Sequence, residues 1–263
     1  MQNKGLYAQN IRAIVEVLRK SERILFISGA GLSAESGLPT YRGIGGLYNG
    51  RLTDLGLPIE EVLSGQMMRE NPELTWHYLT EIEQASRNAT FNPAHKIIAE
   101  MEKHFPRSWV LTQNVDGFHQ LAGSKNVIDI HGNMRKLYCA KCGFRIDDVD
   151  YLTVSIPPKC PDCQSIMRPD VVFFGEYLDE QKTRQLSAEL AAGFDMIFSV
   201  GTSSLFPYIY EPVLNTVNQH TYTVEINPSD TIITAQVSVK LSTGAVQALR
   251  DIWELYLQSG ASK

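Results

Sequence analysis

The four cysteines of this 263-residue chain form two Cys-x-x-Cys pairs, Cys139 with Cys142 and Cys160 with Cys163, with seventeen residues between the pairs. Thiolates at this spacing are typical of a tetrahedral zinc site. Four thiolates fill the coordination shell and leave no position for a water, so we expect the zinc to be structural rather than catalytic. Because such a site folds around its metal, removal of zinc should unfold the segment that carries the cysteines.

A glycine-rich turn follows the first predicted strand. The apolar residues 23–28 lead directly into Gly-Ala-Gly at residues 29–31. Such a turn lets the backbone approach a pyrophosphate, while the helix that follows offers free N–H groups to the anion. A tight strand-to-helix turn without a ligand explains the glycines alone equally well. The hydroxyls of Ser33 and Ser36 and the cation of Arg42 favour the phosphate site.

Three polar side chains, Gln113, Asn114 and Asp116, come directly after the apolar residues 108–112. In a doubly wound sheet the ligand binds at the carboxyl ends of the strands. Side chains of this kind can orient an amide or a ribose at that edge. A capped turn remains an alternative, because Asn and Asp are common turn residues.

One histidine stands out among six by its position. His131 follows the apolar residues 126–130 and precedes Gly132, which leaves room for a ligand. Histidine is the side chain best suited to moving a proton near neutral pH. A lone histidine is more often structural, so its place at a strand end is the argument for a catalytic role.

Three later apolar segments also carry candidate binding residues. Residues 221–226 precede Asn227, which is placed to hydrogen-bond a ribose. Residues 171–175 predict an exposed edge that can accept an extended peptide by β-augmentation. Residues 196–200 precede a phosphate-binding candidate made of Gly201, Thr202 and Ser203.

Apolar segments alternate with segments of helical periodicity along the chain. The apolar segments predict strands at residues 23–28, 108–112, 126–130, 196–200 and 221–226. Helices are expected at residues 9–20, 74–82, 93–104, 180–193 and 245–257. This alternation predicts an α/β fold with a doubly wound, Rossmann-like parallel sheet covered by helices on both faces.

Two stretches interrupt the alternation. Residues 44–85 are rich in glycine before their helical part, and residues 134–169 carry the cysteines. We interpret them as a helical insertion and a zinc ribbon that together form a small lobe. The Rossmann-like nucleotide-binding domain then comprises residues 1–43, 86–133 and 170–263.

Composition and charge narrow the function classes. The net charge of −5 argues against sequence-independent binding of nucleic acid, which requires a basic surface. It does not exclude a lysine-bearing peptide or protein as substrate. All cysteines belong to the two pairs, which favours a reducing compartment. Because no apolar leader and no run of 18 apolar residues is present, we expect a cytoplasmic protein without a membrane span.

Taken in order, the motifs resemble the sirtuin family of NAD-dependent protein-lysine deacylases over about residues 20–250. The resemblance is carried by GAGLSAESGLPTYRG, TQNVDGFHQLAG, the His131-Gly132 pair, CxxC…CxxC, VVFFGE, GTSS, EIN and a late Gly244-Ala245. Residues 39–43 and the glycines that follow resemble the branch that includes bacterial deacylases and the mitochondrial desuccinylase.

The resemblance implies NAD as co-substrate, an acyl-lysine peptide bound as an extended strand, and one structural zinc. It implies that the amide oxygen of acyl-lysine attacks C1′ of the nicotinamide ribose, with free lysine, nicotinamide and 2′-O-acyl-ADP-ribose as products. His131 is the implied general base, and Asn114 and Asp116 complete the implied catalytic set. The implied NAD contacts are Gly29, Ala30, Gly31, Ser33, Ala34, Tyr41, Arg42, Gln113, Asn114, Asp116, Gly201, Thr202, Ser203, Asn227 and Ala245.

The chain departs from this family at two places. Tyr41 stands where most members have phenylalanine, a conservative change. Desuccinylating members carry Tyr-x-x-Arg on the helix at residues 74–82, where Arg pairs with the acyl carboxylate. Alignment on Trp76 places Leu79 and Ile82 there, and a shifted alignment on Tyr78 places Glu81 there. We therefore expect succinyl- and malonyl-lysine to be disfavoured. The full set of expected substrate contacts is Leu79, Ile82, Val172, Phe174 and Gly175.

Other functions stay open. Sirtuin-like domains also hydrolyse NAD or transfer ADP-ribose to protein, although such chains often lack the zinc ribbon. A non-catalytic sensor of NAD or acyl-lysine would have no need of a base at His131. A zinc ribbon that binds nucleic acid is disfavoured by the acidic balance and the scattered cations around the cysteines. We expect a monomer.

Overall fold

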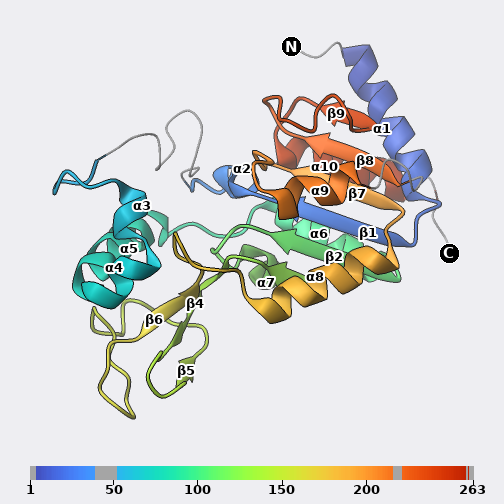
Figure 1. The fold of residues 1–263 in the computed structure, drawn as a ribbon. Helices are drawn as coiled ribbons and strands as arrows, with labels where there is room; N and C mark the ends of the chain where they lie inside the picture. Colours follow the sequence, from blue (N-terminus) through green and yellow to red (C-terminus); the bar gives the residue numbers. More distant parts are fainter. Residues whose placement is uncertain (1–3, 39–51, 216–220, 259, 261–263) are drawn as a thin grey trace.

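The main sheet is parallel and doubly wound. The computed structural model of the chain describes residues 4–38, 52–215, 221–258 and 260. Its strands run in the order β3-β2-β1-β7-β8-β9, and each neighbouring pair is parallel (Figure 1). The predicted Rossmann-like α/β fold is confirmed. The strands are β1 (Arg23–Ser28), β2 (Arg107–Thr112), β3 (Val127–Asp129), β7 (Met196–Val200), β8 (Tyr222–Ile226) and β9 (Val239–Leu241).

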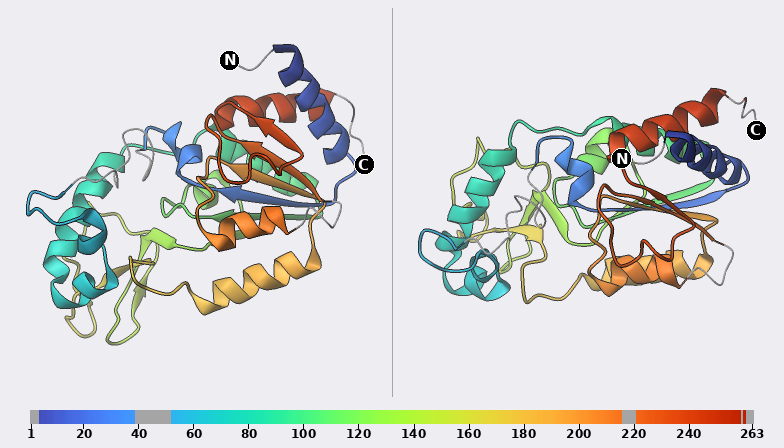
Figure 2. Two further views of the ribbon diagram at one scale, coloured as in Figure 1. Left: turned by 45° about the horizontal axis from the view of Figure 1, so that its top comes forward. Right: turned by 90° about the horizontal axis from the view of Figure 1, so that it is seen from above.

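Alternate residues of the central strand enter two apolar clusters, one on each face of the sheet. Phe26 of β1 packs with the first helical layer, whereas Leu25 and Ile27 pack with the second. Successive side chains of a strand point to opposite faces, so an entirely apolar strand must be covered on both. Figure 2 shows the two layers. The first contains α1 (Lys4–Leu18), α6 (Pro93–His104) and α10 (Ala245–Gln258), and the second contains α8 (Glu180–Ala192) and α9 (Pro207–Leu214).

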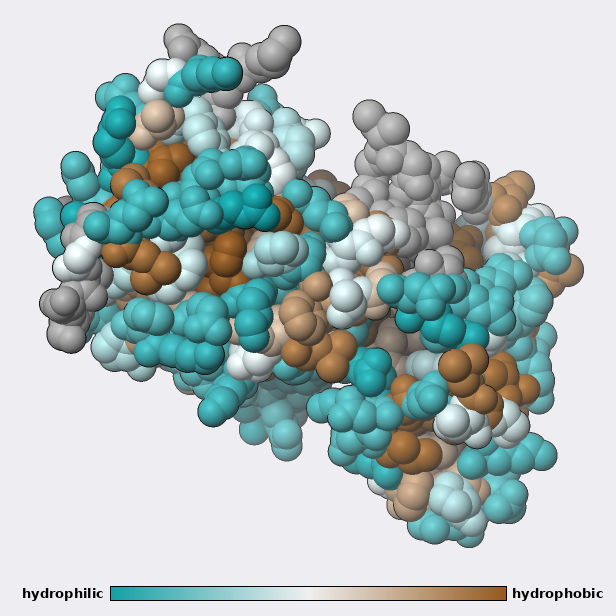
Figure 3. Space-filling view, turned by 180° about the vertical axis from the view of Figure 1, so that it is seen from behind, coloured by the Kyte–Doolittle hydropathy of each residue, from teal (hydrophilic) through white to brown (hydrophobic). Residues whose placement is uncertain are grey.

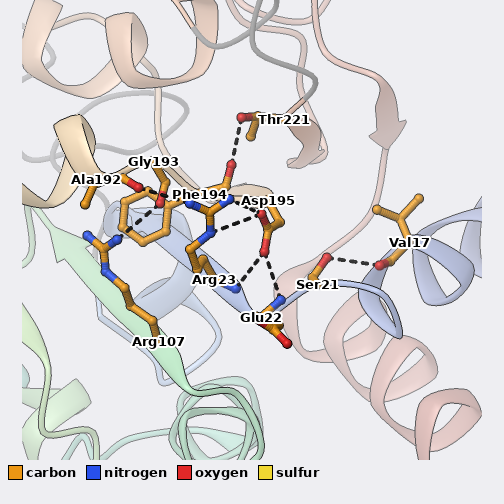
Figure 4. A network of polar contacts seen from close by, with 10 residues as sticks. All are labelled: Val17, Ser21, Glu22, Arg23, Arg107, Ala192, Gly193, Phe194, Asp195 and Thr221. Carbon is orange, nitrogen blue, oxygen red and sulfur yellow. Dashed lines mark hydrogen bonds and ion pairs between the residues drawn. The ribbon is translucent and has the colours of Figure 1, made fainter.

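The amino edge of the sheet is fastened by polar contacts around Asp195 (Figure 4). Its carboxylate accepts hydrogen bonds from the N–H groups of Glu22 at 2.9 Å and Arg23 at 3.0 Å, and from Nε of Arg23 at 3.1 Å. Beside it, the Thr221 hydroxyl donates to the carbonyl of Phe194 at 2.8 Å. These bonds join the starts of β1, β7 and β8, which are neighbours in the sheet.

A small lobe stands out from the sheet domain, with a narrower waist between the two (Figure 3). Helical and ribbon segments share one apolar cluster there, in which Trp76 is buried and donates from Nε1 to the carbonyl of Met167 at 2.9 Å. The predicted boundaries between the domains stay a prediction. The elements of the lobe are α3 (Ile59–Val62), α4 (Gly65–Glu70), α5 (Pro72–Ser86) and the antiparallel strands β4 (Gly132–Tyr138), β5 (Arg145–Ile146) and β6 (Arg168–Val171).

Two helices have other bounds than expected. The opening helix occupies Lys4–Leu18 instead of residues 9–20. The helix expected at residues 74–82 begins at Pro72, because the Asn71 side chain accepts from the N–H of Leu74 and proline suits a first helical turn. No described helix combines the length and apolarity needed to cross a membrane.

Candidate active site at the carboxyl edge of the sheet

The glycine-rich turn after β1 packs directly on the loop after β7. A Cβ on Gly29 would lie 2.8 Å from Cα of Thr202, and one on Gly31 would lie 2.7 Å from Cα of Gly201. The N–H of Gly31 donates to the carbonyl of Gly201 at 2.8 Å, and Gly201 itself has φ of +60°. Glycine is therefore required on both sides of this contact. The contact brings the first and one of the last sequence motifs together, at the start of α2 (Ala30–Ala34).

Asn114, Ser33 and Asp116 form one hydrogen-bonded chain beside the turn. Nδ2 of Asn114 donates to the Ser33 hydroxyl at 3.0 Å and to the carbonyl of Gly29 at 3.1 Å. The Ser33 hydroxyl donates in turn to Oδ2 of Asp116 at 2.7 Å. Asn114 and Ser33 are buried, so these bonds satisfy polar groups that water does not reach. The network fixes the two predicted residues of the β2 loop against the turn after β1.

The carboxylate of Asp116 is held in an unfavourable place for a charge. Burial raises its pKa, although hydrogen bonds from the N–H of Phe118 and the hydroxyl of Ser33 favour the charged form. Phe118 begins the short helix α7 (Phe118–Ala122). No ion pair to Asp116 occurs within the part of the chain that the structure describes.

The remaining strand-end residues meet across three strands. The Thr202 hydroxyl donates to Oε1 of Gln113 at 3.0 Å, and Nδ2 of Asn227 donates to the carbonyl of Thr202 at 2.9 Å. Gln113 follows β2, Thr202 follows β7 and Asn227 follows β8. Ser203 is exposed beside them. Residues far apart in the sequence therefore form one continuous polar edge.

His131 lies at the end of β3 with both ring nitrogens engaged. Nδ1 is 3.1 Å from the carbonyl oxygen of Gln113, and Nε2 is 2.7 Å from the hydroxyl of Tyr208. A carbonyl only accepts, so Nδ1 carries the hydrogen and the neutral ring has its lone pair on Nε2. Burial lowers the pKa of His131, the bond to Gln113 opposes this, and the nearby cation of Lys182 adds to it. The ring is thus a neutral base with a fixed tautomer.

The four cysteines converge in the small lobe. Their sulfur atoms lie within 4.8 Å of one another, the one such metal-ligand group that the described residues contain. Tight turns bring the pairs together: the N–H of Gly143 donates to the carbonyl of Cys139, and the N–H of Gln164 donates to that of Cys160, both at 2.9 Å. Four convergent thiols without a disulfide fit a closed zinc shell, as the sequence predicts.

Two expected NAD contacts, Tyr41 and Arg42, fall outside the described residues. Ala34 ends α2, and Ala245 begins α10. The expected substrate residues line the small lobe and the segment that joins it to the sheet domain: Leu79, Ile82, Val172, Phe174 and Gly175.

Sequence reasoning missed three residues that support the site. Glu35 accepts from the N–H of Val246 at 2.9 Å and so ties the start of α10 to the end of α2. Lys182 donates to the carbonyl of Asp129 at 2.8 Å, just before His131. Tyr208 meets the histidine itself. Acidic groups prefer the amino ends of helices, which explains the contact of Glu35, but its partner is 211 residues away in the sequence.

The comparisons with known proteins agree with this geometry. A family model described as Sir2 family matches residues 29–206. The chain is 48% identical over 245 residues to NAD-dependent protein deacylase 2 of Pseudomonas aeruginosa, covering 92% of this chain and 95% of that protein. It is 36% identical to NAD-dependent protein deacylase 1 of Caldanaerobacter subterraneus, covering 90% and 96%.

Solved structures give the same result. A crystal structure of a Sir2 homolog–NAD complex superposes with a TM-score of 0.80 at 30% identity, covering 94% of both chains. A Sir2–p53 peptide–NAD⁺ structure gives a TM-score of 0.79 at 28% identity, covering 93% of this chain and 98% of that one. Sequence, fold and site agree, and the chain belongs to the Sir2 family.

Proposed function

We propose that the protein is an NAD-dependent protein-lysine deacylase that acts at the carboxyl edge of its parallel sheet. The observation that carries this proposal is that a neutral, oriented His131 bonds the carbonyl of Gln113, which directly precedes Asn114 of the hydrogen-bonded Asn114–Ser33–Asp116 chain. The names of the relatives and the NAD and peptide complexes of the structural neighbours support it.

NAD supplies the ADP-ribose that receives the acyl group, with nicotinamide as leaving group. We assign its pyrophosphate to the turn at residues 29–33 and its nicotinamide and adjoining ribose to Gln113, Asn114 and Asp116. Asp116 fits this assignment, because a carboxylate whose pKa is raised by burial gains from a cationic ring beside it. The remaining proposed NAD contacts are Ala34, Tyr41, Arg42, Gly201, Thr202, Ser203, Asn227 and Ala245.

His131 is the proposed base. Its Nε2 carries the lone pair of the neutral ring, while Nδ1 is held by the carbonyl of Gln113. A proton taken at Nε2 leaves the Nδ1 bond intact, so the ring keeps its orientation through the transfer. We propose that this proton comes from the ribose hydroxyls and that 2′-O-acyl-ADP-ribose is the product.

The acyl-lysine peptide is proposed to extend along residues 171–175. This segment is rigidly held: the N–H of Val172 donates to the carbonyl of His131 at 2.9 Å, and the N–H of Phe174 donates to that of Leu63 at 3.0 Å. It therefore connects the loop of the base to the small lobe. Gly175 is exposed, with φ of +79°. A strand laid here would place its lysine between the two lobes.

Neutral acyl groups are the proposed substrates. Leu79 is buried and Ile82 partly buried among the apolar side chains of the small lobe. The alternative register gives Glu81, whose exposed carboxylate pairs with His77 at 3.3 Å. An acyl carboxylate placed against Leu79 and Ile82 would lose its hydration without gaining a cation.

The test is mass spectrometry of products formed with NAD and matched acetyl-, myristoyl- and succinyl-lysine peptides. We expect kcat/KM for succinyl-lysine to be at least about 30-fold below that for acetyl-lysine, which corresponds to about 2 kcal/mol of desolvation. Ile82→Arg should bring kcat/KM for succinyl-lysine closer to that for acetyl-lysine, because the cation would pair with the carboxylate of the succinyl group. Gln84→Arg adds the same charge at an exposed position of α5 and should change nothing. Equal turnover of succinyl- and acetyl-lysine would disprove the selectivity.

Three accompanying proposals concern the whole chain. We propose that the helical insertion and the zinc ribbon act as one small domain, since they share an apolar cluster. We propose a monomer. The undisulfided cysteine cluster supports a reducing compartment, for which we propose the cytoplasm.

A further inference from the structure

Tyr208 lies on the first turn of α9, and its hydroxyl oxygen is 2.7 Å from Nε2 of His131. Tyr208 belongs to none of the motifs that carry the family resemblance. Because Nδ1 of the histidine donates to Gln113, the neutral ring can only accept at Nε2, and the tyrosine hydroxyl is the donor. The lone pair that a base needs is therefore occupied by Tyr208.

The hydroxyl is a stable donor. Burial raises the pKa of Tyr208 to about 12, so the group keeps its proton throughout the neutral range. The bond therefore forms between two neutral groups, and either the tyrosine or another hydroxyl can occupy the lone pair of Nε2.

An aromatic stack holds the tyrosine in this place. The rings of Phe206 and Tyr208 are stacked with centroids 5.4 Å apart and an interplanar angle of 14°. The imidazole of His131 meets both edge-on, at 6.0 Å from Phe206 and 5.9 Å from Tyr208. Contacts of this geometry are favourable for aromatic rings. Phe206 is 37% exposed, so the outer side of the stack faces solvent while the hydroxyl faces the base.

We propose that Tyr208 caps the proton-accepting nitrogen of His131 in the ligand-free protein and leaves it when the nicotinamide ribose of NAD binds. The inference rests on the proposed function of His131 as base. Nε2 offers one lone pair, which cannot accept from Tyr208 and from a substrate hydroxyl at the same time. Productive binding must therefore break the 2.7 Å bond. Tyr208 is a positioning residue that acts through His131.

Tyr208→Phe isolates the hydroxyl, because the phenyl ring keeps the stack on Phe206. Removing a hydrogen bond that NAD binding must break should lower KM for NAD by roughly 2- to 12-fold and leave kcat unchanged. Tyr210→Phe is the matched control, since Tyr210 lies two residues further along α9 and packs in the apolar cluster of that helix. It should leave both constants at their wild-type values.

A double-mutant cycle separates capping from a general structural effect. Affinity for NAD, measured by calorimetry without peptide so that no turnover occurs, should increase with Tyr208→Phe in the wild-type background. The same change should have no effect in His131→Ala, where the capped nitrogen is gone. An equal gain in both backgrounds would overturn the proposal.

Carbethoxylation of the free protein tests the cap without any substrate. Diethyl pyrocarbonate reacts with the lone pair of neutral imidazole, and mass spectrometry of peptides reads the rate at each histidine. The rate at His131 should rise severalfold in Tyr208→Phe and stay unchanged in Tyr210→Phe, while the exposed His77 and His104 provide an internal standard. Equal rates in all three proteins would overturn the cap. A wild-type protein that shows the cap but deacylates no peptide would refute the proposed function instead.

Discussion

Replacing Asp116 by asparagine should weaken NAD binding through the loss of one charge. Asparagine keeps the side-chain shape and the oxygen that accepts from the N–H of Phe118 at 2.9 Å. It replaces Oδ2, which accepts from the Ser33 hydroxyl at 2.7 Å, by an amide group that donates. In the proposed complex residue 116 also faces the nicotinamide and its ribose, where a hydrogen bond to a charged acceptor contributes about 1.5–3 kcal/mol and one to a neutral acceptor about 0.5–1.5 kcal/mol. The difference of about 1–1.5 kcal/mol in that contact predicts a KM for NAD that is roughly 5- to 12-fold higher.

Stability should change little. Because burial raises the pKa of Asp116, its charged form is less favourable in the folded than in the unfolded chain near neutral pH. Asparagine removes this cost but also removes the acceptor of the Ser33 hydroxyl, so the two effects oppose each other and the melting temperature should stay close to that of the wild-type protein. The assays are thermal unfolding and an NAD titration at saturating acetyl-lysine peptide, with the exposed Asp147→Asn as control. A lower melting temperature together with an unchanged KM would show that Asp116 is a structural residue and refute the reasoning.

Three further outcomes are expected. Chelation of zinc should change the fluorescence of Trp76, because Trp76 and the cysteines belong to the same apolar cluster of the small lobe, and should leave the helical signal of the sheet domain. An unaltered fluorescence spectrum after removal of the metal would count against a structural zinc. The midpoint of the acidic limb of kcat/KM should lie below pH 6.5, the ordinary pKa of histidine, because a lowered pKa keeps His131 unprotonated further into the acid range. A midpoint above pH 6.5 would contradict the assignment of His131 as the base. Burial lowers the pKa of His95 from 6.5 to about 4. Between these two pH values only the unfolded chain binds a proton at His95, so the stability that is fully present above pH 6.5 is lost as the pH falls. At about pH 5 the free energy of unfolding should be lower by about 2 kcal/mol. His95→Gln retains a capping-box residue, and its free energy of unfolding, measured with urea at each pH, should lack this part of the pH dependence.

The strand ends could be predicted because each is a short apolar segment followed at once by polar residues. Parallel strands place such ends on one edge, so Asn114, Asp116 and His131 were expected to meet there. The zinc ligands were predictable from spacing alone. Contacts between residues distant in sequence could not be predicted, as with Glu35 at the start of α10.

Tyr208 shows why the rest of the site could not be predicted from the sequence. It lies on α9, an eight-residue helix that contains Pro212 and begins at another proline. Proline inside such a segment argues against a helix, so the periodicity signal is lost. Its contact with His131 joins residues 77 apart in the sequence. Tertiary packing of the second helical layer, through residues such as Ile209, overrides the local signal.

The most direct test of the account compares the amounts of nicotinamide and deacylated peptide formed in one reaction. With NAD and an acetyl-lysine peptide, the wild-type protein should release the two in equal amounts, together with the same amount of acetyl-ADP-ribose. His131→Ala should lose the deacylated peptide, because no base remains to activate the ribose. Nicotinamide and ADP-ribose formed without any peptide consumed would contradict the account and identify an NAD hydrolase.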